Sequence, residues 1–438
     1  MNYIKRNLCI ATTLVVFVFM LSQLVQGQKS FVSVKDHQFI VNGKPYYYIG
    51  TNYWYGGLLA LLDDPTKGKK RLQKELDFLN KKGVNNLRVL AGVEGSGQIN
   101  GVQRVSPSLQ PEQGRFDDTL LKGLDYLLAE MGKRNMKAVI FLSNNWEWSG
   151  GFLQYLNWNG LLDDSIMRRK LSWDENRDIV QQFCTCSPCK EAYSNQLKLI
   201  VSRTNTISGK LYKDDAAIMA WELANEPRPM RAEAIPAFRK WIGDASSMIK
   251  TLDPNHLVTT GSEGEMGSEN METFEAVHAV KTIDYLTIHI WPKNWGWFSD
   301  TLISAGFSRI LNNTSAYIDK HIEVAKRLKK PLVIEEFGLP RDNHSFINKS
   351  STTLRDNYYR QMFTRWNESR LSNGIVAGCN FWGFGGIGRA AENSHHTWGE
   401  GDDYTSDPPM EEQGLNSVFD NDKSTWKLIK AFTKISTE

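Results

Sequence analysis

Eight short apolar runs, separated by longer amphipathic segments, constrain the fold of this chain more than any other feature. The runs cover 46–50, 86–90, 138–142, 218–223, 257–260, 285–288, 332–334 and 375–381. Continuous apolarity over a few residues is typical of parallel strands that are buried on both faces. We therefore expect eight central parallel strands.

The segments between these runs have the periodicity of helices that cover a sheet. Within 117–136 one face collects Leu120, Leu121, Leu124, Leu127, Leu128 and Met131. Less regular helical patterns occupy 70–82, 190–206, 232–252, 315–329 and 351–371, and a short one occupies 270–277. This alternation predicts an α/β chain folded as a (β/α)8 TIM barrel with long rim loops, and a doubly wound open sheet is the alternative. A short N-terminal hairpin over 39–45, with its turn at Asn42-Gly43, is expected to close the base of the barrel.

The first 27 residues have the pattern of a secretory signal peptide. Lys5 and Arg6 precede an almost wholly apolar stretch over 8–21, and cleavage is expected after Gly27. A membrane anchor is the alternative, but the apolar run is short for a spanning helix. We expect a secreted or periplasmic protein without stable membrane insertion, in which 28–438 forms a single catalytic domain.

Four cysteines follow this segment, at Cys184, Cys186, Cys189 and Cys379. In an oxidising compartment they suggest disulfides, and three pairings are possible. The C-x-C-x-x-C cluster could instead hold a metal ion, but no neighbouring histidine completes a tetrahedral set. We expect no metal site, and the sequence leaves the pairing open.

The charge balance limits the partners of this chain. Lys and Arg number 52 against 49 Asp and Glu, and no dense basic stripe is present. Since nucleic-acid binding depends on a strong basic field, nucleic acid is not an expected partner. The 14 tryptophans are numerous for this length, and many follow predicted strand ends, where a barrel carries its active site.

Two glutamate motifs stand where predicted strands end. The fourth run leads into Trp-Glu-Leu-Ala-Asn-Glu-Pro-Arg over 221–228, and the seventh leads into Glu-Glu-Phe-Gly over 335–338. The carboxyl ends of barrel strands share one rim, so these acids converge. A pair of salt-bridged structural acids is one interpretation. Two carboxylates on one rim also fit the chemistry of glycoside hydrolysis.

In these motifs the chain resembles glycoside hydrolase family 5, and within it the endo-β-1,4-mannanases. The resemblance extends from 50–54 (Gly-Thr-Asn-Tyr-Trp) to Trp382 and is most specific over 220–228. It implies that Glu226 is the general acid/base and Glu336 the nucleophile of a secreted retaining endo-β-1,4-mannosidase that needs no cofactor. Its expected partner is a β-mannan-type polysaccharide (mannan, glucomannan or galactomannan), and the chain is expected to be a monomer.

The two other glutamates of the motifs are not assigned to the catalytic pair. Strand alternation is expected to point Glu335 to the side opposite Glu336. Glu222 lies deeper in its strand than Glu226. For acid catalysis Glu226 needs a raised pKa.

The resemblance also implies a supporting shell. Arg88 is expected to keep Glu336 ionised by charge pairing, and Asn225 to bind the 2-hydroxyl of the sugar. Trp291 stands where the family often has Tyr, and its indole N–H could donate from the same place. The other substrate-binding residues implied are Trp54, Asn145, Trp146, Arg228, Glu263, His289 and Trp382, the last as the floor under the sugar.

The remaining tryptophans divide by their predicted positions. A place in rim loops is expected for Trp148, Trp158, Trp295, Trp297 and Trp398, and a packing role for Trp173, Trp221, Trp241, Trp366 and Trp426. Three alternative functions are an endo-β-1,4-glucanase of the same family, an exo-acting β-mannosidase or mannobiohydrolase, and a non-catalytic glycan-binding barrel. The exo-acting enzyme would need an extra loop that blocks one end of the cleft. The binding barrel would have no reason to keep both glutamates with Arg88.

Overall fold

The computed structural model describes residues 31–64, 67–299, 303–390 and 396–435. The predicted signal peptide over 1–27 lies outside the described residues.

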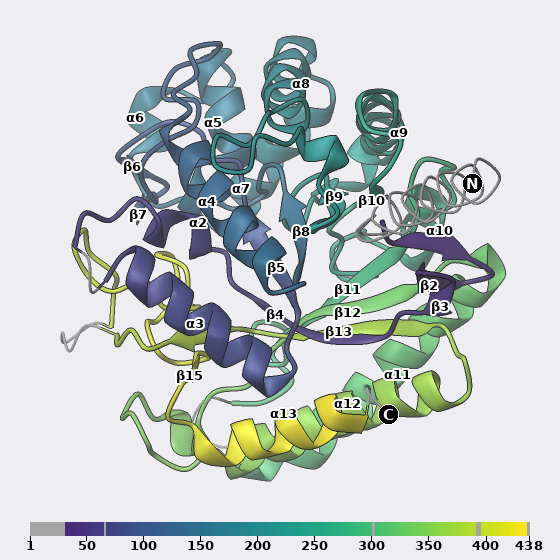
Figure 1. Cartoon of the computed structure of the whole chain (residues 1–438). Helices are drawn as coiled ribbons and strands as arrows, with labels where there is room; N and C mark the ends of the chain where they lie inside the picture. Colours follow the sequence, from purple (N-terminus) through teal and green to yellow (C-terminus); the bar gives the residue numbers. More distant parts are fainter. Residues whose placement is uncertain (1–30, 65–66, 300–302, 391–395, 436–438) are drawn as a thin grey trace, which may run out of the picture.

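Eight parallel strands form the barrel (Figure 1): β4 (Tyr48–Asn52), β5 (Asn86–Leu90), β8 (Lys137–Phe141), β9 (Ile218–Glu222), β10 (Leu257–Thr259), β11 (Leu286–Ile290), β12 (Leu332–Phe337) and β13 (Val376–Phe381). Their order, β10-β9-β8-β5-β4-β13-β12-β11, follows the chain around a ring. The seam between β10 and β11 is bridged by the N–H of Asp284, which donates to Val258 O over 2.8 Å. The predicted runs are therefore confirmed as strands, and the open-sheet alternative is wrong.

Helices cover the outside of the ring, as the amphipathic segments predict. They are α3 (Lys69–Lys82), α4 (Thr119–Lys133), α8 (Ser187–Val201), α9 (Ile235–Leu252), α10 (Met271–His278), α11 (Ile303–Leu328), α12 (Thr353–Leu371) and α13 (Lys423–Ile435). The main difference is at α11, which begins well before its predicted start at 315. Among the described residues, no helix is both long enough and apolar enough to cross a membrane.

A three-stranded antiparallel sheet closes the base of the barrel. It consists of β1 (Ser33–Lys35), β2 (Gln38–Val41) and β3 (Lys44–Pro45), and Figure 1 shows β2 and β3 at one end of the barrel, away from β15. Asn42 and Gly43 form the turn with φ of 53° and 74°. The ring of Phe39 is fully buried between Tyr48 and Tyr285, with centroids 6.3 and 5.1 Å away. The predicted hairpin at the base is confirmed.

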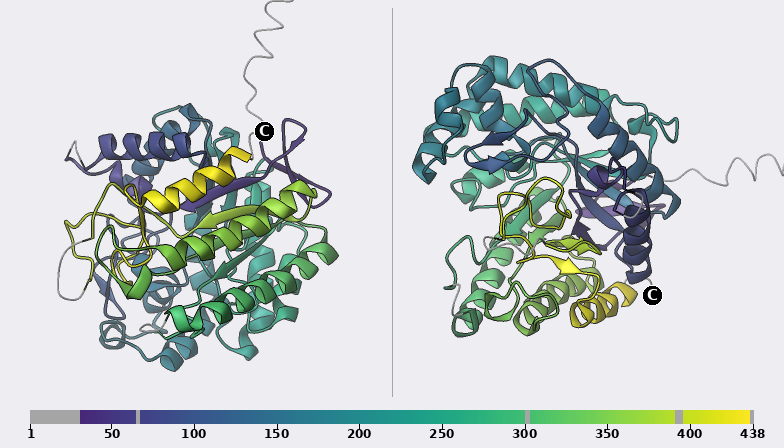
Figure 2. Two further views of the ribbon diagram at one scale, coloured as in Figure 1. Left: turned by 90° about the horizontal axis from the view of Figure 1, so that it is seen from below. Right: turned by 90° about the vertical axis from the view of Figure 1, so that its left-hand side faces the viewer.

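The opposite rim carries the long connections. They contain the helices α2 (Gly56–Leu59), α5 (Gly151–Trp158), α6 (Asp164–Met167) and α7 (Trp173–Val180), and the short strands β6 (Gln98–Ile99), β7 (Val102–Gln103), β14 (Phe384–Gly386) and β15 (Val418–Phe419). Figure 2 (right) shows the connection between β14 and β15 in front of the barrel strands. These connections form the walls around the carboxyl ends of the strands.

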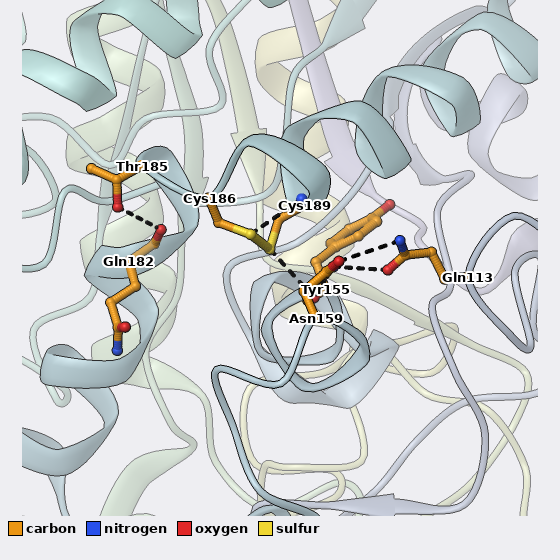
Figure 3. The surroundings of a disulfide bond; sticks show 7 residues. All are labelled: Gln113, Tyr155, Asn159, Gln182, Thr185, Cys186 and Cys189. Carbon is orange, nitrogen blue, oxygen red and sulfur yellow. Dashed lines mark hydrogen bonds between the residues drawn. A yellow bond between two sulfur atoms is a disulfide. The ribbon is translucent and has the colours of Figure 1, made fainter.

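One disulfide joins Cys186 to Cys189 where α8 begins (Figure 3). Cys184 and Cys379 are buried free thiols. Among the described residues, none of the three pairings that would join all four cysteines is therefore present.

Candidate active site

Glu226 and Glu336 meet in a cleft of about 910 Å³ at the rim. One carboxylate oxygen of each lies within 4.8 Å of the other. Glu226 follows β9 with a φ of 52°, a left-handed conformation that non-glycine residues seldom adopt and that often marks a functional turn. The turn is fixed by the N–H of Glu226, which donates to Gly261 O over 3.0 Å.

A β-bulge in β12 turns two successive carboxylates into the barrel. Ile288 pairs with Ile334, but His289 pairs with Glu336, so Glu335 has no partner in β11. An extra residue of this kind re-aims the side chains around it. Both Glu335 and Glu336 are buried and contact His289 and Arg88. The prediction that Glu335 points away from Glu336 is therefore wrong.

Arg88, in the middle of β5, binds the carboxyl groups that lie below the cleft. Its guanidinium donates to Glu336, to both oxygens of Glu222 (2.9 and 2.5 Å) and to Asn225 Oδ1 (2.7 Å). All these groups are nearly inaccessible to solvent, so the buried charge of Arg88 is compensated. Charge pairing of Arg88 with Glu336 is as expected, and Glu222 is a second anchor for the same guanidinium.

His289 lies between the two catalytic candidates. Its Nδ1 is 2.6 Å from Glu226 Oε1 and 3.4 Å from Glu336 Oε2, while its Nε2 is 3.3 Å from Glu335 Oε2. Burial lowers the pKa of His289, but the surrounding carboxylates, first Glu336, outweigh burial and raise the pKa to about 10. The imidazole therefore holds a proton that it can pass to Glu226 along the 2.6 Å contact.

The two carboxyl groups respond differently to this histidine. Burial raises the pKa of Glu226, but the hydrogen bond and charge of His289 outweigh burial and lower it. The expected raised pKa of Glu226 is therefore not found. For Glu336, burial outweighs the opposing charges of His289 and Arg88 and raises the pKa. Glu226, His289 and Glu336 thus share protons as one unit.

Two tryptophans donate to the same carboxylates. Trp146 Nε1 donates to Glu226 over 2.5 Å, and Trp291 Nε1 donates to Glu336 over 3.0 Å. The indole of Trp291 therefore supplies the donor expected at a position where the resemblance implies Tyr. Trp382 also lines the cleft and meets Trp291 edge to face, with centroids 5.6 Å apart. Trp382 thus lies in the cleft, and its role as the floor under the sugar stays a prediction.

Arg228 contacts Trp146, Trp173 and Glu263, and these residues form the outer wall of the cleft. Its guanidinium lies 5.0 Å from the centre of the Trp146 ring and 5.6 Å from that of Trp173. It also pairs with Glu263 at 2.5 Å. Cation–π contacts of this kind hold a side chain in place, so Arg228, Glu263 and Trp146 form one ordered wall beside Glu226.

Comparisons with known proteins agree with this geometry. A family profile described as "GH family 5 beta-mannosidase-like" matches residues 29–437. The chain belongs to glycoside hydrolase family 5. Mannan endo-1,4-beta-mannosidase 1 of Arabidopsis thaliana is 30% identical over 389 residues, which cover 84% of this chain and 86% of that protein. The protein of the same name from Oryza sativa subsp. japonica is 30% identical over 377 residues, 82% of this chain and 80% of that protein.

Comparison with solved structures also leads to glycoside hydrolase family 5. The family 5 mannosidase from Rhizomucor miehei superposes with a TM-score of 0.82 and 32% identity, and the match covers 93% of this chain and 98% of that one. The family 5 resemblance and the (β/α)8 fold are thus confirmed, and the chain is a glycoside hydrolase.

The family 5 cleft does not contain every residue that the resemblance implies. Trp54 is buried below it, where its Nε1 donates to Ser406 O over 2.8 Å. Asn145 is also buried outside the lining, and its amide has no partner among the described residues. Arg88 and His289 act from beneath the surface. The lining itself includes Trp146, Asn225, Glu226, Arg228, Glu263, Trp291, Glu336 and Trp382.

Other lining residues were missed by reasoning from the sequence. Trp173 was expected to pack in a helix, but 49% of it is exposed and it lines the cleft, so that prediction is wrong. Trp241, Trp366 and Trp426 are buried as expected. The missed residues also include Pro408, Met410 and Glu411 from the connection between β14 and β15. This connection is long and has no apolar periodicity, so the sequence does not indicate which of its residues reach the cleft.

One group in this family 5 site has the spacing of metal ligands. Glu226, His289 and Glu336 place one donor atom each within 4.8 Å of the others. The raised pKa of His289 keeps its Nδ1 protonated, and the guanidinium of Arg88 already binds Glu336. A cation would have to displace that proton and face Arg88, so these residues fit proton transfer better than a metal ion.

Proposed function

We propose that the chain hydrolyses β-1,4-mannosidic bonds of mannan-type polysaccharides with retention of anomeric configuration. The observation that carries this proposal is the pair of Glu226 and Glu336, with oxygens within 4.8 Å of each other. Retaining enzymes hold their carboxyl groups roughly 5–5.5 Å apart, whereas inverting enzymes leave about 6.5–9.5 Å for a water molecule. The relatives named mannan endo-1,4-beta-mannosidases support a mannan substrate.

In the proposed reaction Glu336 attacks the anomeric carbon while Glu226 protonates the leaving oxygen. The bond from the anomeric carbon to the leaving oxygen breaks, and an ester bond to Glu336 forms. Glu226 receives its proton from His289, 2.6 Å away, as the aglycone leaves. Glu226 then takes a proton from water, whose oxygen attacks the anomeric carbon and breaks the ester bond to Glu336. Return of that proton from Glu226 to His289 restores the starting state.

Two modes of attack fit this chemistry. Cleavage of internal bonds is the mode named for the plant relatives, and removal of terminal sugars is the alternative. An endo-β-1,4-glucanase would use the same two glutamates, so the sugar itself must be tested. We also propose that the chain is exported, on the strength of the apolar stretch after Lys5 and Arg6.

The test compares the wild-type chain with Glu336→Gln and Glu226→Gln on linear mannan, galactomannan and carboxymethylcellulose. We expect mannose or manno-oligosaccharides from the wild type, and a loss of about 10²–10⁴-fold in kcat for Glu226→Gln, with at least as large a loss for Glu336→Gln. NMR of the first product should show the β-anomer. Release of gluco-oligosaccharides alone, an α-anomer first, or an active Glu336→Gln variant would each overturn the proposal. Full activity in the presence of EDTA is also expected.

A further inference from the structure

The two ends of the cleft differ. The positions of Glu226 and Glu336 show which end binds the glycone and which binds the aglycone. Glu226 protonates the leaving oxygen, so the aglycone lies on its side, beside Arg228 and the exposed rings of the outer wall. Glu336 attacks the glycone sugar, which lies over Trp382. On that side the chain between β14 and β15 closes in, since Ser406 packs against Gly383, the neighbour of Trp382.

Glu411 stands at this glycone end, between two hollows. The catalytic cleft and an outer hollow of about 730 Å³ share only three lining residues, which are Asn294, Met410 and Glu411. Beyond them the outer hollow is lined by Phe298, Leu415 and Asn416, among others. A sugar chain that extended past the glycone site would have to cross this wall.

The turn that carries Glu411 is held in place from several sides. The N–H of Glu411 donates to Pro408 O over 2.8 Å, and the buried amide of Gln413 donates to the carbonyls of Asp407, Pro408 and Glu411 over 2.8, 3.0 and 3.1 Å. Lys293 Nζ binds the next residue, Glu412, at 2.6 Å. Lys293 lies two residues after Trp291, which donates to Glu336. The wall is therefore tied to the nucleophile side of the cleft.

The carboxyl group of Glu411 has the chemistry of a sugar ligand. It makes no hydrogen bond or ion pair with any described residue, although its burial raises its pKa to about 8, aided by Asp407, Glu336 and Glu226. Lys293 acts in the opposite direction. The raised pKa favours the protonated form of the half-buried Glu411, which can both donate to and accept from the hydroxyls of an uncharged hexose.

We propose that Glu411 closes the glycone side of the cleft after a single sugar, binds the hydroxyls of the non-reducing terminal mannosyl unit, and makes the enzyme release mannose from chain ends. This rests on the proposed function. It adds a specificity-determining residue to that function and chooses removal of terminal sugars over internal cleavage.

The first experiment identifies the first products from mannotetraose labelled with 2-aminobenzamide at its reducing end. We expect the wild type to give free mannose and labelled mannotriose. Labelled mannobiose or labelled mannose as the main first product would overturn the inference about Glu411 and leave the proposed function intact. No cleavage of mannotetraose would overturn both.

The second experiment opens the wall with Glu411→Ala, with Glu411→Gln as the conservative variant. Because Glu411→Ala joins the two hollows, the ratio of mannobiose to mannose among first products should rise at least tenfold, and galactomannan viscosity should begin to fall. Glu411→Gln keeps the bulk and should still release mannose. Glu400→Ala, an exposed position in the same connection, is the matched control and should not change the products. An unchanged ratio in a folded Glu411→Ala variant, judged by its melting temperature, would contradict the inference.

Discussion

At the scale of single residues, the proposed hydrolysis depends on the position of one proton among the buried acids and His289. Two buried cations, Arg88 and His289, face four buried carboxyl groups, those of Glu222, Glu226, Glu335 and Glu336. If all of these groups were charged, negative charge would be in excess inside the barrel, which favours retention of protons. In the proposed reaction, the proton that Glu226 passes to the leaving oxygen comes from His289, whose Nδ1 lies 2.6 Å from Glu226 Oε1.

Glu335 is expected to set the upper pH limit of activity through this histidine. Its oxygen lies 3.3 Å from His289 Nε2 and helps to raise the pKa of the imidazole. In Glu335→Gln the lost negative charge lowers that pKa, so the shared proton is lost at a lower pH. The alkaline limb of kcat/KM should move down by about one pH unit, which equals about 1.4 kcal/mol. The measurement is a pH–rate profile on a chromogenic β-mannoside.

The groups that face Glu335 are Arg88, Glu222, His289 and Glu336, together with the hydroxyls of Tyr48 and Tyr285. Glu335→Asp retains the charge and should restore most of the wild-type limb. If Glu335→Gln lowered the rate equally at every pH, Glu335 would only position His289.

The place of a single side chain could be predicted from the sequence where a strand or a motif determines its position. Arg88 lies inside the apolar run 86–90, where a charge needs a buried partner, and Glu336 precedes Phe-Gly at the end of its strand. These positions are enough to predict that the two side chains pair inside the barrel. Glu335 could not be placed in this way, because strand alternation assumes a regular ladder and the bulge in β12 depends on pairing with β11. The raised pKa of His289 likewise follows from neighbours that come together only in the closed barrel.

At the scale of elements, the rim connections decide what the cleft can hold. The helix α7 shows this, because Ser172 caps it and the cap leaves its first residue, Trp173, half-exposed at the cleft wall. Helical periodicity predicts a packing role for Trp173, because a position in a helix does not by itself show which face of the helix lines a cleft. The strands were easier to predict because burial on both faces leaves a continuous apolar run.

Trp173→Ala tests whether α7 forms a binding platform on the aglycone side. The exposed ring contributes little to stability, so the melting temperature should stay close to that of the wild type. The KM for mannotetraose should rise about tenfold, or about 1.4 kcal/mol, because an apolar sugar face loses its platform. The KM for a small chromogenic β-mannoside should change little. Equal increases for both substrates would argue against a platform beyond the bond that is cut.

At the scale of the whole molecule, stability and chemistry are placed at opposite ends of the barrel. The base is closed by Phe39 and the interior residues around it, Tyr48, Val139, Met219, Leu257, Tyr285 and Val333. The rim carries the acids and the long connections. The length of the barrel strands separates the base from the rim.

Phe39→Ala should therefore weaken the fold without changing the chemistry. Loss of a fully buried ring typically costs about 3–5 kcal/mol, and the position packs only at the base. Chemical denaturation should show this loss, while kcat and KM at low temperature should match the wild type. Ser33→Ala, an exposed position in the same sheet, is the control. A large change in KM for Phe39→Ala would show that the base communicates with the rim.

The connection between β14 and β15 has a consequence for how such enzymes diversify. It is anchored by Arg355 of α12, whose guanidinium donates to the carbonyls of Leu415 and Ser417 over 2.8 and 3.1 Å. It contributes the wall at Glu411 but neither catalytic carboxylate. If Glu411 limits the product length as we propose, product length and bond cleavage depend on separate segments of the chain. Exchange of this one connection would then convert an enzyme that removes terminal sugars into one that cleaves internal bonds, with Glu226 and Glu336 unchanged.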